Sequence, residues 1–473
     1  LVSFLISQRA PPSVRRGAQL FAGRFRARSP ALLVEPMAWY WLYSAALSAL
    51  APFGALYLAA RSRRRALLRR FWPSVPDPGC EPIWIHACSV GELNTARGLL
   101  RALESRFPRR ARALTVSTVS AMELARSNEL NAALTWLPFD HPLCVRSFVR
   151  RLSPLALVII ETELWPSLLL ETARAGVPII LVNGRLSDKH FARYSRYRSF
   201  FKPLLACLGA MGMQSGLYAE RIESLGVDPA RVTVTGNTKF DGAGDSGRPG
   251  AELRREAGFP EDGPVVVFGS TRSGDEALAA ACWAEWETRF PGLRLVVAPR
   301  HIQWAEEVEA AFGNRVLRWS KRSSRSKECP RFEKDATVPS ADDRVLILDT
   351  LGDLAAFYTI ATVAVIGGSF YPGVEGHNPI EAAAAGAPVV FGPYMRNFLD
   401  ASDVLTAAGG ALQVGRPEDL SAALAELLRD ESACAAMGEK AKSAVTANQG
   451  ATERTLDLIE PFVCPNASPE ASK

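Results

Sequence analysis

The chain has 473 residues, of which 48% are hydrophobic and 22% are charged. This much apolar material can build buried cores, which excludes a wholly disordered protein, and the length predicts roughly two or three domains. The 55 basic and 49 acidic residues leave a net charge of +6, too slight an excess for this length to indicate nucleic-acid binding.

The first 36 residues carry six arginines and one acid, Glu35. An arginine-rich, acid-poor leader is typical of an organellar presequence. Translation upstream of the natural start explains the same composition, and Met37 is then the start.

Residues 37–60 contain no charged side chain and exceed the length of about 20 residues that crosses a membrane. Four aromatic residues stand near one end, and six arginines follow within 61–70. The positive-inside rule keeps such arginines in the cytoplasm, so this segment is a predicted membrane anchor with the body of the protein on the cytoplasmic side. Pro52 and Gly54 also fit a helix that lies in the interface without spanning, and a buried soluble helix is the third alternative.

Beyond the anchor, short apolar runs alternate with helical patterns, which is typical of βαβ units. In the first half, Leu93, Ala96 and Leu100 recur at helical spacing after the first run. The predicted strands there are 83–86, 114–118, 155–160, 179–182, 208–213 and 232–235.

A stretch rich in glycine and proline, 241–264, is a predicted linker, after which the pattern resumes. The polar run 320–343 is a predicted surface loop, and helices are expected from about 417 to 462. Neither half has Gly-X-Gly-X-X-Gly after its first strand, which disfavours a nicotinamide dehydrogenase. The predicted strands of the second half are 265–268, 293–297, 315–319, 345–348, 363–366 and 389–391.

Acidic side chains follow two predicted strands of the first half. Glu92 opens a helix after Gly91, which permits a tight turn, and its carboxylate can cap backbone N–H groups or act as a base. Glu161 and Glu163 follow the apolar strand 155–160. Acids at the carboxyl end of a strand point to function in an α/β fold, although one of them could cap the next helix.

The second half offers elements that could bind an anion. The turn 269–274 contains Ser270 and Arg272, and its backbone amides could hold a phosphate. Arg300 ends the next strand with a fixed positive charge, and Pro379 stands near the first position of a later helix. Each of these elements alone could equally be an ordinary turn, but all of them lie at one edge of the predicted sheet.

The cysteines and histidines show no metal or disulfide pattern. Eight cysteines stand singly, without a CxxC pair, and only five histidines accompany them. This spacing argues against a structural zinc site and against a disulfide framework.

Six motifs, taken in chain order, resemble motifs of the 3-deoxy-D-manno-octulosonic acid (Kdo) transferases of lipopolysaccharide assembly, which are membrane-anchored enzymes. The likeness runs from about residue 37 to 462 and leaves the leader without a counterpart, which favours Met37 as the start. The motifs are SVGE at 89–92, ETELWP at 161–166, NGRLS at 183–187, VTGNTKFD at 234–241, APRH at 298–301 and GHNPIEAAAAGAPVVFGP at 376–393.

The resemblance implies an α/β protein of the GT-B fold, in which two doubly wound Rossmann-like domains face a central cleft. The first would bind the acceptor and the second the CMP-sugar. The expected segments are a leader at 1–36, an anchor helix at 37–60, domains at 75–243 and 262–445, a C-terminal helix at 446–463 and a tail at 464–473.

The resemblance also implies catalytic roles for three residues. Glu92 matches the general base, which would deprotonate a hydroxyl of the lipid A precursor (lipid IV-A) as it attacks the anomeric carbon of CMP-Kdo with inversion. Glu161 and Lys239 match positions held to stabilise the transition state. The carboxylate suits an oxocarbenium-like centre, and the lysine suits the charge building on the departing CMP phosphate.

A second group of residues matches the segments that bind CMP, where a helix N-terminus would meet the phosphate and a carboxylate would accept from ribose hydroxyls. These residues are Ser270, Arg272, Pro299, Arg300, Leu351, Gly352, Asp353, Asn378, Pro379, Ile380 and Glu381.

Two residues depart from the family pattern, and one common signal is missing. Arg272 stands where the family often has histidine, and Glu375 replaces a glycine before Gly376, which bears on the geometry of that loop. No Asp-X-Asp triplet, the usual metal-chelating signal of nucleotide-sugar transferases, occurs in the chain. We therefore expect cations and helix ends to neutralise the leaving group, with no metal ion and no cofactor besides the donor substrate CMP-Kdo.

The implied partners are CMP-Kdo, the lipid A precursor and the surface of the inner membrane, with no nucleic acid. A basic and aromatic run at 193–202 could contact anionic head groups or could be a solvated helix face. Two rival functions are a UDP-sugar 2-epimerase of the same two-domain type and an inert membrane scaffold. A scaffold has no reason to hold the chemical groups of Glu92, Glu161, Lys239 and Arg300.

Overall fold

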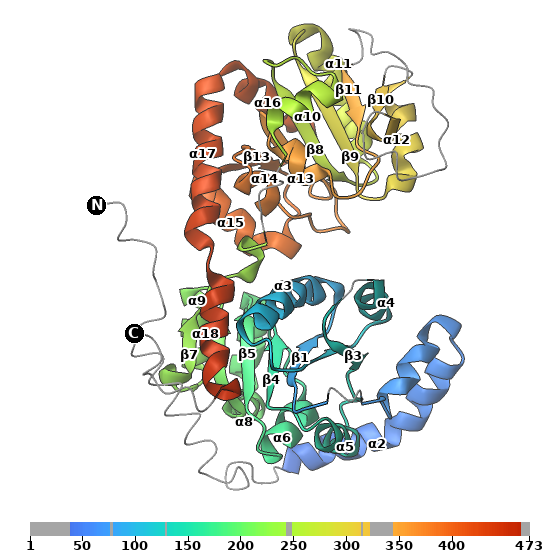
Figure 1. The fold of residues 1–473 in the computed structure, drawn as a ribbon, viewed down its shortest axis with the longest axis vertical. Coiled ribbons are helices and arrows are strands. Elements are labelled where there is room, and N and C mark those ends of the chain that lie inside the picture. The colour runs from blue at the N-terminus through green and yellow to red at the C-terminus, as the bar shows by residue number, and fades with distance from the viewer. Residues whose placement is uncertain are drawn as a thin grey trace. The chain divides into compact units, whose positions relative to one another are not determined.

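The computed structural model describes residues 38–75, 79–127, 130–242, 248–313, 316–321 and 344–464 (Figure 1). Two compact units make up the chain. One holds the residues up to 241 and those from 449 onward, and the other holds 242–448. The predicted leader, most of the polar run at 320–343 and nearly all of the tail lie outside the described residues.

The first unit is built on a sheet of seven parallel strands in the order β3-β2-β1-β4-β5-β6-β7. All six predicted strands are confirmed, and β3 is an addition, because two of its four residues are only partly buried at a sheet edge and the strand forms no apolar run. The strands are β1 (Ile83–Ala87), β2 (Arg112–Val116), β3 (Ala133–Trp136), β4 (Ala156–Ile160), β5 (Ile179–Gly184), β6 (Leu208–Met213) and β7 (Val232–Val234).

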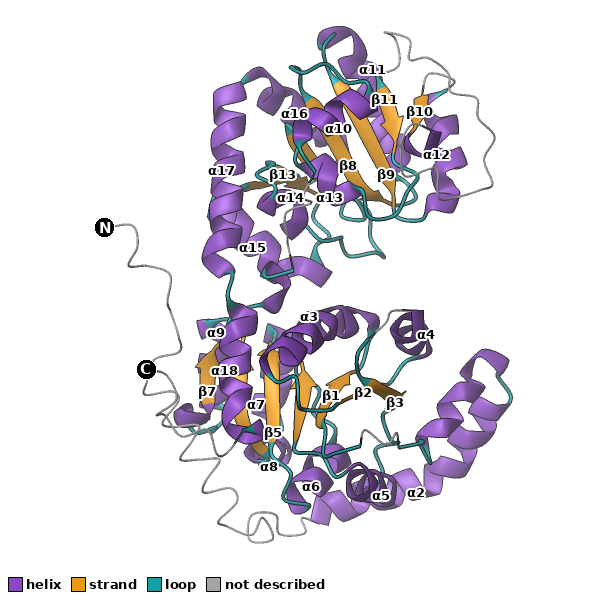
Figure 2. Ribbon diagram, viewed as in Figure 1, coloured by secondary structure: helices purple, strands orange, loops and turns teal. Residues whose placement is uncertain are grey.

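Helices cover both faces of this sheet, as Figure 2 shows. Ile83 and Ile85 pack into one buried cluster and Trp84 into the other, so the apolar runs are buried on both sides. The helices of this part are α2 (Ala38–Ala59), α3 (Val90–Arg106), α4 (Val119–Ser127), α5 (Pro142–Leu152), α6 (Pro166–Arg174), α7 (Asp188–Arg196), α8 (Arg198–Ala206) and α9 (Gly216–Ser224), with short 3-10 turns η2 (Ser62–Arg70), η3 (Pro229–Arg231) and η4 (Thr238–Phe240).

The last helix, α18 (Ala451–Val463), belongs to the first unit. Leu456, Ile459 and Phe462 are buried in the same cluster as the inner face of α3. Asp241 accepts hydrogen bonds from the backbone N–H groups of Gly450, at 2.7 Å, and Thr452, so its carboxylate caps the start of α18.

Replacing Asp241 by alanine should therefore lower the free energy of unfolding by about 1 kcal/mol, the usual effect of losing an N-terminal cap. Urea denaturation of the full chain measures this change. An unchanged midpoint would show that Asp241 does not help to hold α18 in place.

The second unit has a second parallel sheet of seven strands, in the order β10-β11-β9-β8-β12-β13-β14. The six predicted strands are again confirmed, and the short β14 is an addition. The strands are β8 (Val265–Thr271), β9 (Arg294–Pro299), β10 (Val316–Arg318), β11 (Val345–Ile347), β12 (Val363–Ile366), β13 (Val389–Phe391) and β14 (Ala411–Gln413).

The predicted linker at 241–264 needs correction, because it contains a helix, α10 (Gly250–Ala257), whose Leu253 and Ala257 are buried. The glycines and prolines around this helix concealed its apolar face. The other helices of this unit are α11 (Asp275–Arg289), α12 (Ala305–Phe312), α13 (Leu354–Tyr358), α14 (Ile380–Ala384), α15 (Leu399–Ala407), α16 (Leu420–Arg429) and α17 (Glu431–Asn448), with 3-10 turns η5 (Ile302–Trp304), η6 (Trp319–Lys321), η8 (Arg396–Phe398) and η9 (Pro417–Asp419).

Candidate functional site

Each sheet has a point where the strand order reverses, and the predicted site residues follow the strands at that point. In the first unit β1 lies between β2 and β4, and in the second unit β8 lies between β9 and β12. Ligands of open α/β sheets bind outside the carboxyl ends of the strands at such points. Glu92 and Glu161 follow β1 and β4, and Arg272 follows β8.

Glu92 lies in the first turn of α3 and takes part in a capping box. The Ser89 hydroxyl donates to Glu92 Oε1 at 2.8 Å, and the Cys88 N–H donates to Glu92 Oε2 at 2.6 Å. In return, the Glu92 N–H donates to Ser89 Oγ at 3.4 Å. The capping role weighed from the sequence is therefore present, and the same bonds fix the direction of the carboxylate.

The pKa of Glu92 is displaced towards neutrality. Burial and then the nearby charge of Glu163 raise the pKa of Glu92 to about 7, with a smaller contribution from Glu161. Burial also raises the pKa of Glu163. A carboxylate with a pKa near the working pH is well matched to general base catalysis.

The pH dependence of any reaction that needs ionised Glu92 should follow from this shift. The rate should rise with pH through about 7 and then level, because only the deprotonated form accepts a proton. Glu163→Gln removes a neighbouring negative charge, so the pKa of Glu92 should fall and the acid limb should move to lower pH. The measurement is kcat/KM against pH, and an acid limb that stays in place or moves to higher pH would contradict this coupling.

Glu161 and Lys239 are brought together by the ends of β4 and β7. Lys239 Nζ lies 3.9 Å from Glu161 Oε1, and each side chain is 22% exposed. Glu161 has a φ of 61°, in the left-handed region that non-glycine residues rarely adopt, and such strain clusters at functional sites. Asn183, at the end of β5, supports the turn that carries Lys239, because its Oδ1 accepts from the Thr238 N–H at 3.1 Å.

The Cys88 thiol lies beside the two glutamates. Its Sγ and a carboxylate oxygen of each of Glu92 and Glu163 lie within 4.8 Å of one another, a spacing that a metal ion could bridge. Burial, with Glu163 and Glu92 after it, raises the pKa of Cys88 to about 12, so without a bound cation the thiol stays protonated. The absence of a metal stays a prediction.

In the second unit, Arg272 joins two histidines that follow other strands. Its Nη1 donates to His301 Nε2 at 2.9 Å, and its Nε donates to His377 Nε2 at 3.4 Å. Both rings therefore accept at Nε2 and are neutral there. Burial, followed by the charges of Arg300 and Arg272, lowers the pKa of His377 to about 4. The cluster thus keeps two fixed positive charges, which suits an anion such as phosphate.

Asp275 ties the loop after β8 to the loop after β12. Its Oδ2 accepts from the Arg272 N–H at 2.9 Å and from the Gly368 N–H at 2.6 Å. The loops approach so closely that a Cβ on Gly367 would lie 2.5 Å from the Ser270 carbonyl oxygen. Glu375, which replaces a glycine of the family pattern, adopts a φ of 66°. The backbone at this position therefore has a conformation that favours glycine, although the residue is a glutamate.

The other predicted CMP-binding residues fall into two groups. At the start of α14, the Asn378 amide donates to Glu381 Oε1 at 3.1 Å, and Asn378 Oδ1 accepts from the Ile380 N–H at 3.1 Å. After β11, Leu351 is 79% exposed, whereas Asp353 is buried and accepts from Trp319 and Thr350 side chains. Through these hydrogen bonds, the Asp353 carboxylate stabilises the structure of the second unit.

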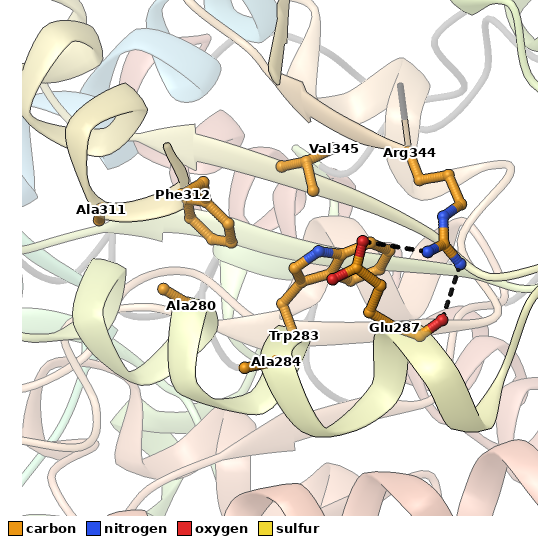
Figure 3. A pocket seen from close by; sticks show the side chains of 8 residues that line it. All are labelled: Ala280, Trp283, Ala284, Glu287, Ala311, Phe312, Arg344 and Val345. Carbon is orange, nitrogen blue, oxygen red and sulfur yellow. Dashed lines mark hydrogen bonds and ion pairs between the residues drawn. The ribbon is translucent and has the colours of Figure 1, made fainter. Parts of the chain in front are cut away.

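A cavity of about 200 Å³ in the second unit lies away from these residues (Figure 3). Trp283, Phe312 and Val345 line it, and Arg344 donates to Glu287 Oε1 at 3.2 Å beside it. Since Val345 begins β11, this cavity lies at the amino ends of the strands, the edge opposite to the predicted site.

Sequence reasoning left several neighbours of the site unassigned. His301 and His377 stand within motifs that carry the family resemblance but are not among the predicted site residues, and Glu163 is predicted only as one of two acids after a strand, without a specific role. Their importance comes from contacts between separate strand ends, which the order of letters does not display.

The two-unit architecture defines the class of protein. It matches MurG of Acinetobacter baumannii with a TM-score of 0.52 and 13% identity, over 80% of this chain and 99% of that chain. It also matches UDP-GlcNAc 2-epimerase of Neisseria meningitidis bound to UDP-GlcNAc, with a TM-score of 0.52 and 10% identity, over 80% and 99%. At these identities the likeness shows the fold alone, which is the two-domain GT-B fold expected from the sequence.

The sequence relatives give the family. A family model described as 3-Deoxy-D-manno-octulosonic-acid transferase (kdotransferase) matches residues 59–242. The 3-deoxy-D-manno-octulosonic acid transferase of Bordetella pertussis is 33% identical over 448 residues, 89% of this chain and 99% of the relative. That of Haemophilus influenzae is 26% identical over 90% of this chain and 99% of the relative. The chain therefore belongs to the 3-deoxy-D-manno-octulosonic acid transferase family and is a glycosyltransferase.

Proposed function

We propose that this protein transfers Kdo from CMP-Kdo to the lipid A precursor lipid IV-A during lipopolysaccharide synthesis, with Glu92 as general base. The observation that carries the proposal is the Glu92 carboxylate. It is fixed by Cys88 and Ser89 at the switch point of the first sheet, with its pKa raised to about 7. Membership of the family supports CMP-Kdo as the donor and a lipid as the acceptor.

In the proposed reaction, ionised Glu92 takes the proton of an acceptor hydroxyl. The hydroxyl oxygen forms a bond to the anomeric carbon of Kdo, and the bond from that carbon to the CMP phosphate oxygen breaks with its electron pair leaving on CMP. Attack from the opposite face inverts the configuration. Glu161 would stabilise positive charge at the sugar carbon, and Lys239 the negative charge on the departing phosphate.

The second unit would bind the CMP group. Arg272 and Arg300 supply permanent charge beside the loops after β8 and β9, and Asn378 to Glu381 supply the start of α14. Neutral His301 and His377 would position Arg272 without adding charge. In line with the lack of an Asp-X-Asp triplet, the proposal includes neither a metal ion nor a cofactor.

The protein would act at the cytoplasmic face of the inner membrane, where a lipid acceptor is within reach. Among the described helices, α2 alone is long and apolar enough to cross a membrane. An apolar helix of this length agrees with a lipid substrate.

Release of CMP tests the proposal against the epimerase alternative. CMP should form only when CMP-Kdo and the lipid acceptor are both present, and UDP-GlcNAc should remain unchanged. Conversion of UDP-GlcNAc to its 2-epimer, without acceptor-dependent release of CMP, would replace the proposed function by the rival one.

A further inference from the structure

Helix α2 is fastened to the first unit by buried polar contacts along its first half. The Tyr40 hydroxyl donates to Glu171 Oε1 at 3.1 Å, and the Tyr43 hydroxyl donates to Asp140 Oδ2 at 2.7 Å. Both carboxylates are buried, and Glu171 also pairs with Arg146 at 2.9 Å. These contacts fix the beginning of α2 on the body of the protein.

The chain returns to the body at the end of η2, the 3-10 turn that follows α2. Arg70, at the end of η2, donates from Nε to the Leu137 carbonyl at 3.0 Å. The Phe71 ring stacks on Phe139 with centroids 4.8 Å apart. The chain is therefore tied to the first unit at the start of α2 and again at the end of η2, which follows α2 (blue in Figure 1).

These ties conflict with a helix that crosses the bilayer. A hydrocarbon core is about 30 Å thick, so a spanning α2 would carry Tyr40 to the side away from Glu171. Ser48 Oγ lies 2.9 Å from His141 Nε2, so only residues 49–59 of α2 extend beyond the contacts with the body. At about 1.5 Å per residue they reach about 16 Å, roughly half of the core.

The outer face of α2 is nevertheless strongly apolar. Five of its large side chains are between 61% and 72% exposed: Trp41, Leu42, Leu50, Phe53 and Leu56. A soluble monomer rarely leaves such a continuous apolar surface in water, so this face indicates a partner.

Exposed basic residues flank this apolar face at both ends. Arg61, Arg64, Arg65 and Arg69 follow the C-terminal end. At the other end the Trp39 ring lies 4.3 Å from Phe200 on α8, and the exposed cations there are Arg193, Arg196, Arg198 and Lys202. Of the aromatic residues in the predicted run 193–202, Tyr194 is buried and stacks on Phe201, whereas Tyr197 is 53% exposed, so the run offers one exposed aromatic ring besides its charges.

We infer that α2 lies in the plane of a single leaflet, with its outer face among the acyl chains and the arginines at both ends on anionic phospholipid head groups. An apolar stripe flanked by arginine and lysine fits such a surface by shape and by charge. Both ends of α2 then lie on the same side of the membrane as the catalytic body. The inference concerns topology and stands whether or not the proposed reaction is correct.

Cysteine labelling of the full chain in spheroplasts tests the side on which α2 begins. Ala38→Cys places a thiol at the exposed start of the helix, and the native exposed Cys80 reports the body. A membrane-impermeant maleimide, located by peptide mass spectrometry, should label both thiols only after detergent permeabilisation. Labelling at position 38 alone in intact spheroplasts would show that α2 spans the membrane.

A vesicle experiment tests the face itself. Leu50→Glu with Phe53→Glu changes two exposed side chains and should lower the fraction bound to phosphatidylglycerol-containing vesicles at least tenfold, with an unchanged melting temperature. Leu217→Glu, at a position 53% exposed on α9, is the matched control and should bind normally. Full retention of the double variant on vesicles would overturn the assigned face.

Discussion

Glu92→Gln should lower kcat for Kdo transfer by about 10²- to 10⁴-fold, the range that general base catalysis contributes. The amide cannot accept the proton of the acceptor hydroxyl. Its oxygen can still accept from the Cys88 N–H, so the start of α3 should persist. Steady-state kinetics with saturating CMP-Kdo and lipid acceptor measure the change, and binding of CMP-Kdo should be retained.

The variant should also stay folded. The raised pKa means that the folded state holds a proton on Glu92 more tightly than the unfolded chain does, so Glu92 opposes folding increasingly as pH rises from 4.5 to about 7 and by a constant amount at higher pH. The neutral glutamine removes that effect, and the melting temperature at pH 8 should be unchanged or higher. Glu123→Gln, an exposed glutamate on α4, is the matched control. Wild-type rates in Glu92→Gln would exclude Glu92 as the base.

Lys239→Met should lower kcat by about 10²- to 10³-fold, comparable to losing one preorganised group that stabilises transition-state charge. Methionine keeps much of the length of the lysine side chain. It removes the positive charge that lies 3.9 Å from Glu161 Oε1 in the wild type. The effect should fall on kcat more than on KM for CMP-Kdo, because the charge on the leaving phosphate develops during the reaction.

The matched control is Lys440→Met, an exposed lysine on α17 in the second unit. It should retain full activity. If Lys239→Met raised only KM and left kcat unchanged, Lys239 would contribute to binding and not to the transition state.

The sheets were largely predictable because their central strands are continuous apolar runs, buried on both faces. The sequence also placed Glu92, Glu161 and Arg272 after strands. Strands β3 and β14 were not predicted, because they are short edge strands with partly exposed residues. The helix α10 was not predicted, because glycine and proline surround its few buried positions.

What the sequence could not supply were contacts between distant segments. Tyr40 meets Glu171 across 131 positions, and this single contact changes how the apolar segment can sit in a membrane. Arg272 meets His301 and His377 only because β8, β9 and β12 are neighbours in the sheet. The pKa of Glu92 likewise depends on Glu163, which another strand positions.

The most direct test is mass spectrometry of the lipid after the purified protein is incubated in detergent micelles with tetraacylated lipid A precursor and with CMP-Kdo generated in situ. The wild type should add Kdo to the lipid, and Glu92→Gln should bind CMP-Kdo without producing detectable product in the same time. An unmodified lipid, under conditions where the wild type is folded and binds CMP, would contradict the proposed transfer.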